Sequence, residues 1–267
     1  MTPARIERRR SLLTVILAAC IPGLLQAQSP AQKFIGMWSD PPDTITGVFC
    51  SGWCTDAGLD RLNVLLDDPA NDVRPIQQVQ AEANTYQIDQ YVRPRLSNSA
   101  LKNYPLDPAD DPSFIKCEPY GLARQIPSRH QLEIRQLSKD ILELHYGEWD
   151  VRRTIYMDGR KSPTNVPMSL LGYSVGHWEN ETLVIETSGI RANRTPWNSE
   201  HSDKLHVVER YTRSADGKTL TVAATMQDPV GLKEPVVLKH IWAWRPDQTI
   251  APYDQCEIPK EFKRGTR

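Results

Sequence analysis

Histidine and carboxylate side chains gather in one stretch of the chain, and together they supply the groups that acid–base catalysis needs. His201 and His206 precede Glu209 there, and Glu186 is a second carboxylate on an earlier predicted strand. Positioned histidines and carboxylates are the side chains that most often transfer protons in enzymes. We therefore predict that Glu209, His206, His201 and Glu186 are catalytic residues.

The alternation of side chains along a strand determines which way Glu209 points. Residues two apart share a face, so Glu209 shares its face with Val207 and Tyr211. If these neighbours face an apolar interior, Glu209 does too, and an unpaired buried carboxylate has a raised pKa that suits a general acid or base. The alternative is a structural ion pair with an arginine such as Arg160 or Arg152.

Aromatic and basic side chains on the predicted strands are candidates for contact with a ligand. These candidates are Tyr173, Trp178, Arg160, Arg210, His240 and Trp242. For His240 the alternative is a hydrogen-bonded core histidine, because it alternates with tryptophans on an apolar side. No metal site is expected, since the spacing of His201 and His206 matches neither a strand face nor a helix turn.

The segment Gly172-Tyr173-Ser174-Val175-Gly176 matches the G-x-S-x-G pattern of the nucleophile elbow in α/β-hydrolases. That elbow needs a strand before the serine and a helix after it. Here a short turn leads directly into another predicted strand, 182–187. We therefore expect Ser174 not to act as a nucleophile, and the glycines to allow close backbone packing.

Alternating apolar residues separated by turn residues fill the second half of the chain. Asn180 and Gly217 fall in two predicted hairpin turns, where a positive φ angle is needed. Strands are predicted at residues 131–136, 141–147, 151–157, 173–178, 182–187, 205–213, 219–226 and 236–244. The predicted fold is all-β: an up-and-down antiparallel β-barrel of the lipocalin-like kind, with an open sandwich or half-barrel as the alternative.

The part of the chain before the barrel is less regular. We predict a first strand at 34–38, helices at 56–66 and 76–91, and a proline-rich wrapping loop at 94–127, with Asp56 as the N-cap of the first helix. The chain therefore divides into a signal peptide at 1–27, a segment at 28–129 with the first strand, helices and loop, and the barrel meander with its tail at 130–267.

Residues 1–27 have the basic start, apolar middle and small-residue exit of a signal peptide. The apolar stretch is short of the roughly 20 residues that cross a bilayer, so no stable membrane insertion is expected. We predict a periplasmic or secreted, soluble protein. Two alternatives stay open: twin-arginine export through Arg9-Arg10, and a lipid anchor on Cys20.

Four cysteines remain after the signal peptide: Cys50, Cys54, Cys117 and Cys256. An even number in an oxidising compartment favours two disulfides. A zinc site built from these thiolates is the alternative, but the spacing lacks the usual paired knuckles. The formal net charge of −1, without a polybasic run, also gives no basic field for nucleic acid.

Several segments resemble a family of exported bacterial proteins to which no activity is assigned. The resemblance rests on Met157-Asp158-Gly159-Arg160, Gly172 to Glu179 with its GxSxGxW pattern, and His201 to Arg210 with its HSxxLHxxER pattern. It implies export but no particular reaction, and Cys50 and Cys54 lie outside its pattern. Gly36-Met37-Trp38 also resembles the GxW signature of lipocalins.

We consider three functions. The first is a cofactor-independent lyase, isomerase or hydratase that acts on a hydrophobic or aromatic small molecule in the barrel. The second is a noncatalytic lipocalin-like binding or carrier protein for a hydrophobic ligand. The third is an envelope interaction protein that uses the proline-rich loop. The first is the main hypothesis, because polar residues gather near one strand end.

Overall fold

The computed structural model describes residues 30–39, 41–253 and 256–257. The predicted signal peptide, with its twin-arginine motif and Cys20, lies outside these residues. Among the helices of the described residues, none is long and apolar enough to cross a membrane.

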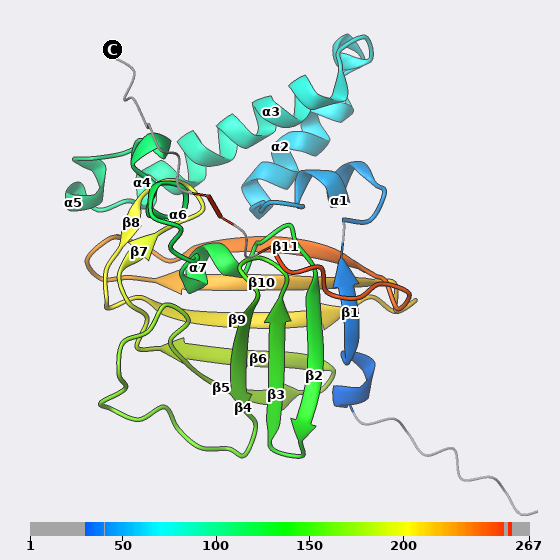
Figure 1. Ribbon diagram of the computed structural model, residues 1–267. Helices are drawn as coiled ribbons and strands as arrows, with labels where there is room; N and C mark the ends of the chain where they lie inside the picture. Colours follow the sequence, from blue (N-terminus) through cyan, green and yellow to red (C-terminus); the bar gives the residue numbers. More distant parts are fainter. Residues whose placement is uncertain (1–29, 40, 254–255, 258–267) are drawn as a thin grey trace, which may run out of the picture.

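A closed barrel of nine strands forms the body of the molecule (Figure 1). Going round the barrel, the strand order is β1-β11-β10-β9-β6-β5-β4-β3-β2. The strands are β1 (Gly36–Ser39), β2 (Leu132–Ser138), β3 (Ile141–Tyr146), β4 (Val151–Tyr156), β5 (Tyr173–Glu179), β6 (Thr182–Ser188), β9 (His206–Arg213), β10 (Thr219–Gln227) and β11 (Val236–Trp244). The prediction of an all-β barrel is confirmed, and each predicted strand is present within one or two residues of its expected ends.

One seam departs from the antiparallel arrangement. β4 and β5 run parallel and pair only at Ile155 with Ser174 and at Tyr156 with Val175. A parallel pair needs a connection that carries the chain back to the same end of the sheet, and the loop at 157–172 does this. The strictly up-and-down meander is therefore wrong at this seam, and β4 and β5 share little of their length.

The barrel interior is filled by side chains that alternate with outward-facing ones. β10 shows this most clearly, since Leu220, Val222, Ala224 and Met226 are fully buried while the residues between them are partly exposed. Trp38 is also fully buried, donates from Nε1 to the carbonyl of Phe34 at 2.9 Å, and packs edge-on against a tryptophan of β11. These contacts join the first and last strands and help to close the barrel.

Two turns have the backbone that their residues predict. Asn180, between β5 and β6, has φ of 55°, and Gly217, between β9 and β10, has φ of 73°. Both angles lie in the left-handed region that tight hairpins need. Between β6 and β9 the chain also forms a small hairpin of β7 (Asn193–Arg194) and β8 (Glu200–His201), which the sequence did not predict.

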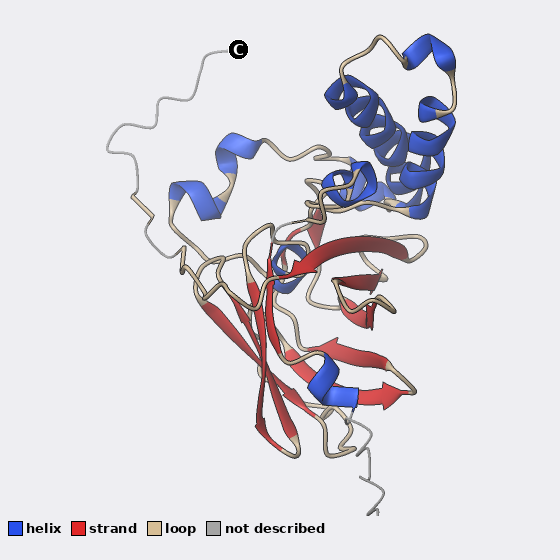
Figure 2. Cartoon of the chain, turned by 90° about the vertical axis from the view of Figure 1, so that its right-hand side faces the viewer, coloured by secondary structure: helices blue, strands red, loops and turns tan. Residues whose placement is uncertain are grey.

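Helices precede the barrel meander in sequence, and the longer ones lie together at one end of the strands in both views (Figures 1 and 2). The main helices are α2 (Asp56–Leu66) and α3 (Ile76–Tyr86), and α3 continues as a π-helical segment at Gln87–Val92. Both predicted helices are confirmed, but the N-cap of α2 is Thr55, whose hydroxyl accepts from the amide of Gly58, and not Asp56.

The predicted wrapping loop contains several short helices. These are α4 (Arg93–Arg95) at its start, then α5 (Asn98–Leu101), η4 (Pro108–Asp110), α6 (Pro112–Ile115) and α7 (Leu122–Gln125). Earlier in the chain lie the short helices η1 (Pro30–Lys33), α1 (Ile45–Phe49) and η2 (Pro69–Asn71). α7 joins the barrel core, because Leu122, Ala123 and the following Ile126 are fully buried within it.

Both disulfides expected from the cysteine count are present. Cys50 is bonded to Cys54, and Cys117 is bonded to Cys256 across 139 residues of sequence. Cys54 also pairs through its backbone with Lys239 of β11, with N–O distances of 2.9 and 2.7 Å. The backbone hydrogen bonds of Cys54 therefore attach the start of the helical segment to β11, the first disulfide closes a local loop there, and the second disulfide ties the C-terminal segment to the loop before α7.

Candidate functional site

A buried ion pair between Arg153 and Glu209 occupies the barrel interior. Glu209 is fully buried and Arg153 is 2% exposed. Arg153 donates from Nη2 and Nη1 to the two carboxylate oxygens at 2.6 and 3.0 Å, which is a bidentate arrangement. Burial lowers the pKa of Arg153, but the charge of Glu209 outweighs it, so the pKa is raised and the guanidinium stays charged.

Hydroxyl groups complete the surroundings of this pair. Arg153 also donates to Ser174 Oγ at 2.9 Å and to Thr187 Oγ1 at 2.6 Å, and Tyr211 donates to Glu209 at 2.7 Å. Burial, together with the carboxylate charge, raises the pKa of Tyr211, so its phenol stays protonated. The hydroxyl of Tyr146 is buried without a hydrogen-bond partner in the described part of the chain.

The prediction for Glu209 is confirmed in its direction and corrected in its partner. Glu209 faces the interior, and the structural alternative of an arginine pair is present. The partner is neither Arg152, which pairs with Glu143 outside the barrel, nor Arg160, which pairs with Asp158. The side chain of Arg153 points from β4 into the barrel, whereas that of the neighbouring Arg152 points outward, so Arg153 is the one that reaches Glu209. Both carboxylate oxygens are occupied, and a proton transfer by Glu209 would have to break one of these bonds.

The parallel seam opens a cleft of about 400 Å³ in the barrel wall between β4 and β5. We call it the seam cleft. It is lined by Pro119, Tyr120, residues 151–154 and Tyr156 of the β4 side, and residues 169–174 of the β5 side. Since Arg153 and Ser174 line this cleft and are themselves almost fully buried, they form its inner wall. The seam cleft therefore ends against Arg153, the cationic member of the buried ion pair, while Glu209 lies behind it and is not part of the lining.

Two predicted ligand-binding residues meet at the rim of the seam cleft. Tyr173 stacks on Tyr156 with ring centroids 5.0 Å apart. The guanidinium of Arg160 lies 4.2 Å from the ring centroid of Tyr156 and donates to the hydroxyl of Tyr173 at 3.4 Å. Asp158 holds Arg160 in place through its carboxylate. Arg160, Tyr156 and Tyr173 therefore form one stacked group beside the cleft.

The four predicted catalytic residues are not assembled in one site. His206 and Glu186 lie together on the outer side of the wall, where they line a surface pocket of about 530 Å³ with Arg160 and His177. Glu209 points the other way, into the interior, because β9 alternates as predicted. His201 lies on β8, outside the barrel, and lines a different pocket. The acid–base group that the sequence predicted is thus divided among three places.

The other predicted ligand residues are also dispersed. Arg210 is exposed and pairs with Glu179 on the outer face, and Trp178 packs against Phe34 at a centroid distance of 5.2 Å. His240 and Trp242 are buried in the interior, where their rings meet edge-on at 4.1 Å.

His240 adopts the alternative role of a core histidine. Its Nδ1 lies 3.3 Å from the carbonyl oxygen of Gly52. Burial lowers the pKa of His240 to about 3, so this imidazole is neutral at neutral pH. The carbonyl can only accept, so Nδ1 carries the proton.

Ser174 has the environment of a structural residue. It lies within β5, which is followed by a turn and then by β6 without an intervening helix. Ser174 is 1% exposed. Its hydroxyl accepts a hydrogen bond from Arg153 and lies 3.1 Å from Thr187 Oγ1. The expectation that this motif is no nucleophile elbow is confirmed by its structural context.

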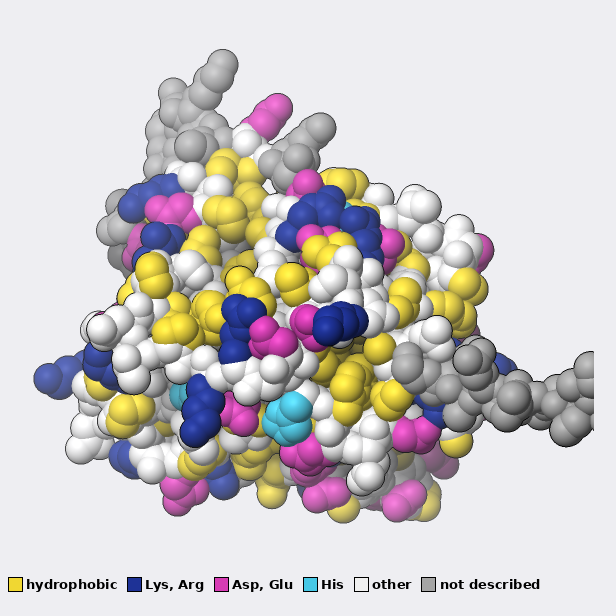
Figure 3. Space-filling model, turned by 90° about the horizontal axis from the view of Figure 1, so that it is seen from below, with side chains coloured by type: hydrophobic (Ala, Val, Ile, Leu, Met, Phe, Trp, Pro, Cys, Tyr) yellow, Lys and Arg dark blue, Asp and Glu magenta, His cyan; other side chains and the backbone are white. Residues whose placement is uncertain are grey.

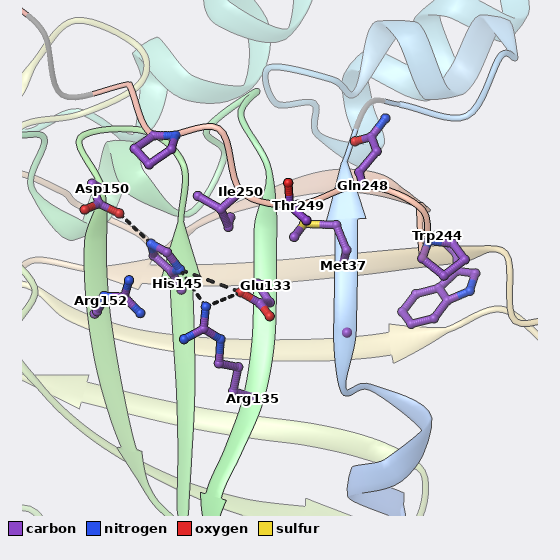
Figure 4. Close-up of a pocket in the computed structure, with 13 residues that line it drawn as sticks. Met37, Glu133, Arg135, His145, Asp150, Arg152, Trp244, Gln248, Thr249 and Ile250 are labelled. Carbon is purple, nitrogen blue, oxygen red and sulfur yellow. Dashed lines mark hydrogen bonds and ion pairs between the residues drawn. The ribbon is translucent and has the colours of Figure 1, made fainter.

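A further pocket, of about 540 Å³, contains a histidine that reasoning from the sequence missed. It lies on the outer face of β2, β3 and β4, beneath the C-terminal segment at 246–252 (Figure 4). His145 faces outward from β3, yet it is only 3% exposed because that segment covers it. Two features of the sequence could have indicated it: His145 alternates with apolar residues in its strand, and a carboxylate, Asp150, follows five residues later.

Both ring nitrogens of His145 are engaged. Nε2 lies 2.6 Å from Asp150 Oδ1, while Nδ1 lies 3.4 Å from Arg135 Nη2 and 3.7 Å from Glu133 Oε2 (Figure 4). Hydrogen bonding to Arg135 lowers the pKa of Glu133, which keeps that carboxylate charged. Since neither nitrogen is left for a substrate, this network fastens the strands and the turn to one another.

The surface seen from below the barrel carries charges of both signs (Figure 3). Lysine and arginine side chains alternate there with acidic ones and with small apolar groups. No single-sign field covers this face, which agrees with the near-zero net charge of the sequence.

Comparison with known proteins gives one distant likeness of structure. No family model matches the chain, and no curated protein matches it. A crystal structure of the fluorescent protein UnaG, as its N57A mutant, matches 42% of this chain and 68% of its own, with 17% identity and a TM-score of 0.26. This similarity is too low to assign a ligand or a family, and the barrel itself defines the fold class.

Proposed function

We propose that this protein is an exported, noncatalytic carrier that binds a small hydrophobic or aromatic molecule in the seam cleft. The observation that carries the proposal is the cleft itself, an opening in the wall of an otherwise filled barrel. Its volume of about 400 Å³ is within the range of small-molecule sites, which run from about 300 to 1,000 Å³.

The lining of the seam cleft has the composition that such a ligand prefers. Leu170, Leu171 and Val151 provide aliphatic surface, and Tyr120, Tyr156 and Tyr173 provide aromatic rings. Aromatic rings bind flat apolar molecules by stacking while their hydroxyl groups stay near water. The site therefore favours a compact apolar ligand over a charged polymer.

The inner wall gives such a ligand a preferred orientation. Ser174 and Arg153 are the polar groups at that end, and a ligand oxygen placed there would share their donors with Glu209 and Thr187. The apolar part would then lie among the leucines and tyrosines near the surface. A few polar groups in a mainly apolar pocket are what sets specificity in ligand sites.

Binding in the seam cleft explains the arrangement better than acid–base catalysis does. A general base must reach the proton it removes, with a donor–acceptor distance of about 2.6 to 3.2 Å. Glu209 already uses its oxygens for Arg153 and Tyr211. His206 and Glu186 lie on the opposite side of the wall. The enzyme hypothesis therefore lacks an assembled set of groups.

Export to the periplasm is part of the proposal. Two disulfides are present in the described chain, and such bonds persist in oxidising compartments. The longer one fixes the C-terminal segment, and with it the cover of the His145 pocket. A protein that must stay folded outside the cytoplasm benefits from both links.

The proposal is tested by titration with 8-anilinonaphthalene-1-sulfonate, an apolar dye with one anionic group. We expect saturable fluorescence enhancement for the folded protein. Ser169→Phe places a ring in the cleft from an exposed position of the lining and should abolish that enhancement. Leu137→Ser is the matched control, because Leu137 is 56% exposed on β2 and lies outside the cleft lining.

The two variants separate the possible outcomes. Loss of dye binding in Ser169→Phe but not in Leu137→Ser supports the seam cleft. Equal binding by the wild type and Ser169→Phe contradicts it, provided that far-ultraviolet circular dichroism shows both variants folded.

A further inference from the structure

A second pocket, separate from the seam cleft, lies beside the β7–β8 hairpin. Its volume is about 460 Å³. We call it the hairpin pocket, and it is lined by Asp110, Pro112, Glu118, residues 191–194, Glu200 and His201. It thus joins the hairpin to the loop around α6, which lies on the same side of the molecule (Figure 1).

His201 is the notable residue of the hairpin pocket. It is 3% exposed, and its Nδ1 lies 3.0 Å from the carbonyl oxygen of Ser202. A carbonyl oxygen only accepts, so Nδ1 carries the hydrogen and Nε2 carries the lone pair. Nε2 has no hydrogen-bond partner in the described part of the chain. A buried polar atom without a partner is unfavourable and calls for one.

The charge state of His201 restricts what that partner is. Burial lowers the pKa of His201, so the ring is neutral at neutral pH and its Nε2 can only accept. The partner must therefore bring an N–H or O–H donor. His145 offers no such lone pair, because both its nitrogens are engaged. This difference sets the hairpin pocket apart from the larger pocket of Figure 4.

The walls of the hairpin pocket carry charges of both signs. Arg191 and Arg194 supply guanidinium groups, and Asp110, Glu118 and Glu200 supply carboxylates. Arg194 is mostly buried and is fixed by donating from Nη1 to the carbonyl of Asp107 at 3.0 Å. A simple anion would be repelled by the carboxylates and by the lone pair of Nε2. A simple cation would be repelled by the guanidinium groups.

We infer that the hairpin pocket binds a small zwitterion of the amino-acid type. In this arrangement the ammonium group donates to Nε2 of His201 and lies near the acidic side chains, and the carboxylate is bound by Arg191, since Arg194 is mostly buried and already donates to the carbonyl of Asp107. The disulfide at Cys117 fixes the loop that carries Glu118, so one wall of the pocket is held in place. The site is independent of the seam cleft and of its ligand.

Nitrogen-15 NMR of the histidine rings tests this inference, with glycine as the probe. Methylammonium and acetate serve as controls, since each carries one half of the glycine charges. We expect the wild type to show a His201 tautomer protonated at Nδ1. Glycine in the millimolar range should shift the Nε2 resonance saturably, methylammonium should shift it more weakly, and acetate should leave it unchanged.

Two variants make the test specific. His201→Asn keeps a side-chain N–H near the position of Nδ1 but removes the Nε2 acceptor, and Arg191→Gln removes one charge from an exposed position. Each should weaken glycine affinity about tenfold, measured by saturation of backbone amide shifts in the hairpin. His177→Asn is the matched control, because His177 is exposed on β5 and lies outside the pocket.

The outcomes are distinguishable. An Nε2 resonance that glycine does not move overturns the inference, and so does a response to acetate equal to the response to glycine. If His201→Asn does not fold, Arg191→Gln decides alone: unchanged glycine affinity in that variant contradicts the site, and reduced affinity supports it. None of these results depends on what binds in the seam cleft.

Discussion

The ion pair between Arg153 and Glu209 yields the sharpest prediction about stability. Glu209→Gln keeps the size of the side chain but removes its charge, which leaves the guanidinium buried without a counter-charge. Breaking a buried pair in this way typically costs about 3–5 kcal/mol. The same figure follows from the contacts, because two charge-assisted hydrogen bonds, each about 1.5–3 kcal/mol, are weakened while the amide oxygen retains part of them.

This loss is large enough to measure easily. For a chain of this size, about 1 kcal/mol corresponds to roughly 2–4 °C in Tm, so Glu209→Gln should lower Tm by roughly 6–20 °C. We expect the double variant Arg153→Met/Glu209→Met to recover most of the loss, since neither charge is then left alone. Recovery stays incomplete because Tyr211 loses its acceptor.

Urea unfolding of the wild type, Arg153→Met, Glu209→Met and the double variant, with the disulfides intact and tryptophan fluorescence as the signal, closes a double-mutant cycle and gives the coupling energy. A coupling of about 2 kcal/mol or more supports the pair. A Glu209→Gln variant within about 1 kcal/mol of the wild type, with unchanged dependence on denaturant, would refute the reasoning. Preserved stability combined with loss of turnover of some substrate would instead favour the catalytic hypothesis.

Two further predictions concern the disulfides and acid stability. Substitution of Cys117 and Cys256 with serine should lower the free energy of unfolding by up to about 5 kcal/mol, because this disulfide closes a loop of 139 residues. The same change at Cys50 and Cys54 should lower it by only about 2 kcal/mol, because that loop is short. Similar losses for the two pairs in urea unfolding would contradict this ordering. Burial lowers the pKa of His240 from 6.5 to about 3, so the unfolded chain binds the proton first and stability falls as the pH drops below about 6.5. At pH 5 this effect lowers the free energy of unfolding of the wild type by about 2 kcal/mol, so the stability of His240→Phe should fall less between pH 7 and 5. If the stabilities of the wild type and of His240→Phe fall in parallel, His240 does not titrate in this way.

The sequence predicts the features of this fold that depend on local spacing. The inward direction of Glu209 follows from alternation with Val207 and Tyr211, and the turn at Asn180 follows from its tolerance of positive φ. The partner of Glu209 was beyond such reasoning. β4 and β9 are not neighbours in the barrel, so the contact between Arg153 and Glu209 depends on how the whole sheet closes.

The seam cleft and the His145 pocket were missed for a related reason. The cleft exists because the loop at 157–172 returns the chain to make a parallel pair, and no residue pattern indicates that return. His145 occupies an outward position that normally implies exposure, and it is buried only because the C-terminal segment lies over it. Contacts between distant segments determine both features, whereas the hydrophobic periodicity and the turn residues of a sequence predict only local structure.

The measurement that tests the central claim most directly is the detection of intermolecular nuclear Overhauser effects between bound 8-anilinonaphthalene-1-sulfonate and labelled methyl groups of the protein. Our account predicts effects to Leu170, Leu171 and Val151, which line the seam cleft. Effects confined to Leu238 and Met226, which fill the barrel interior, would place the ligand in the lumen and contradict the account.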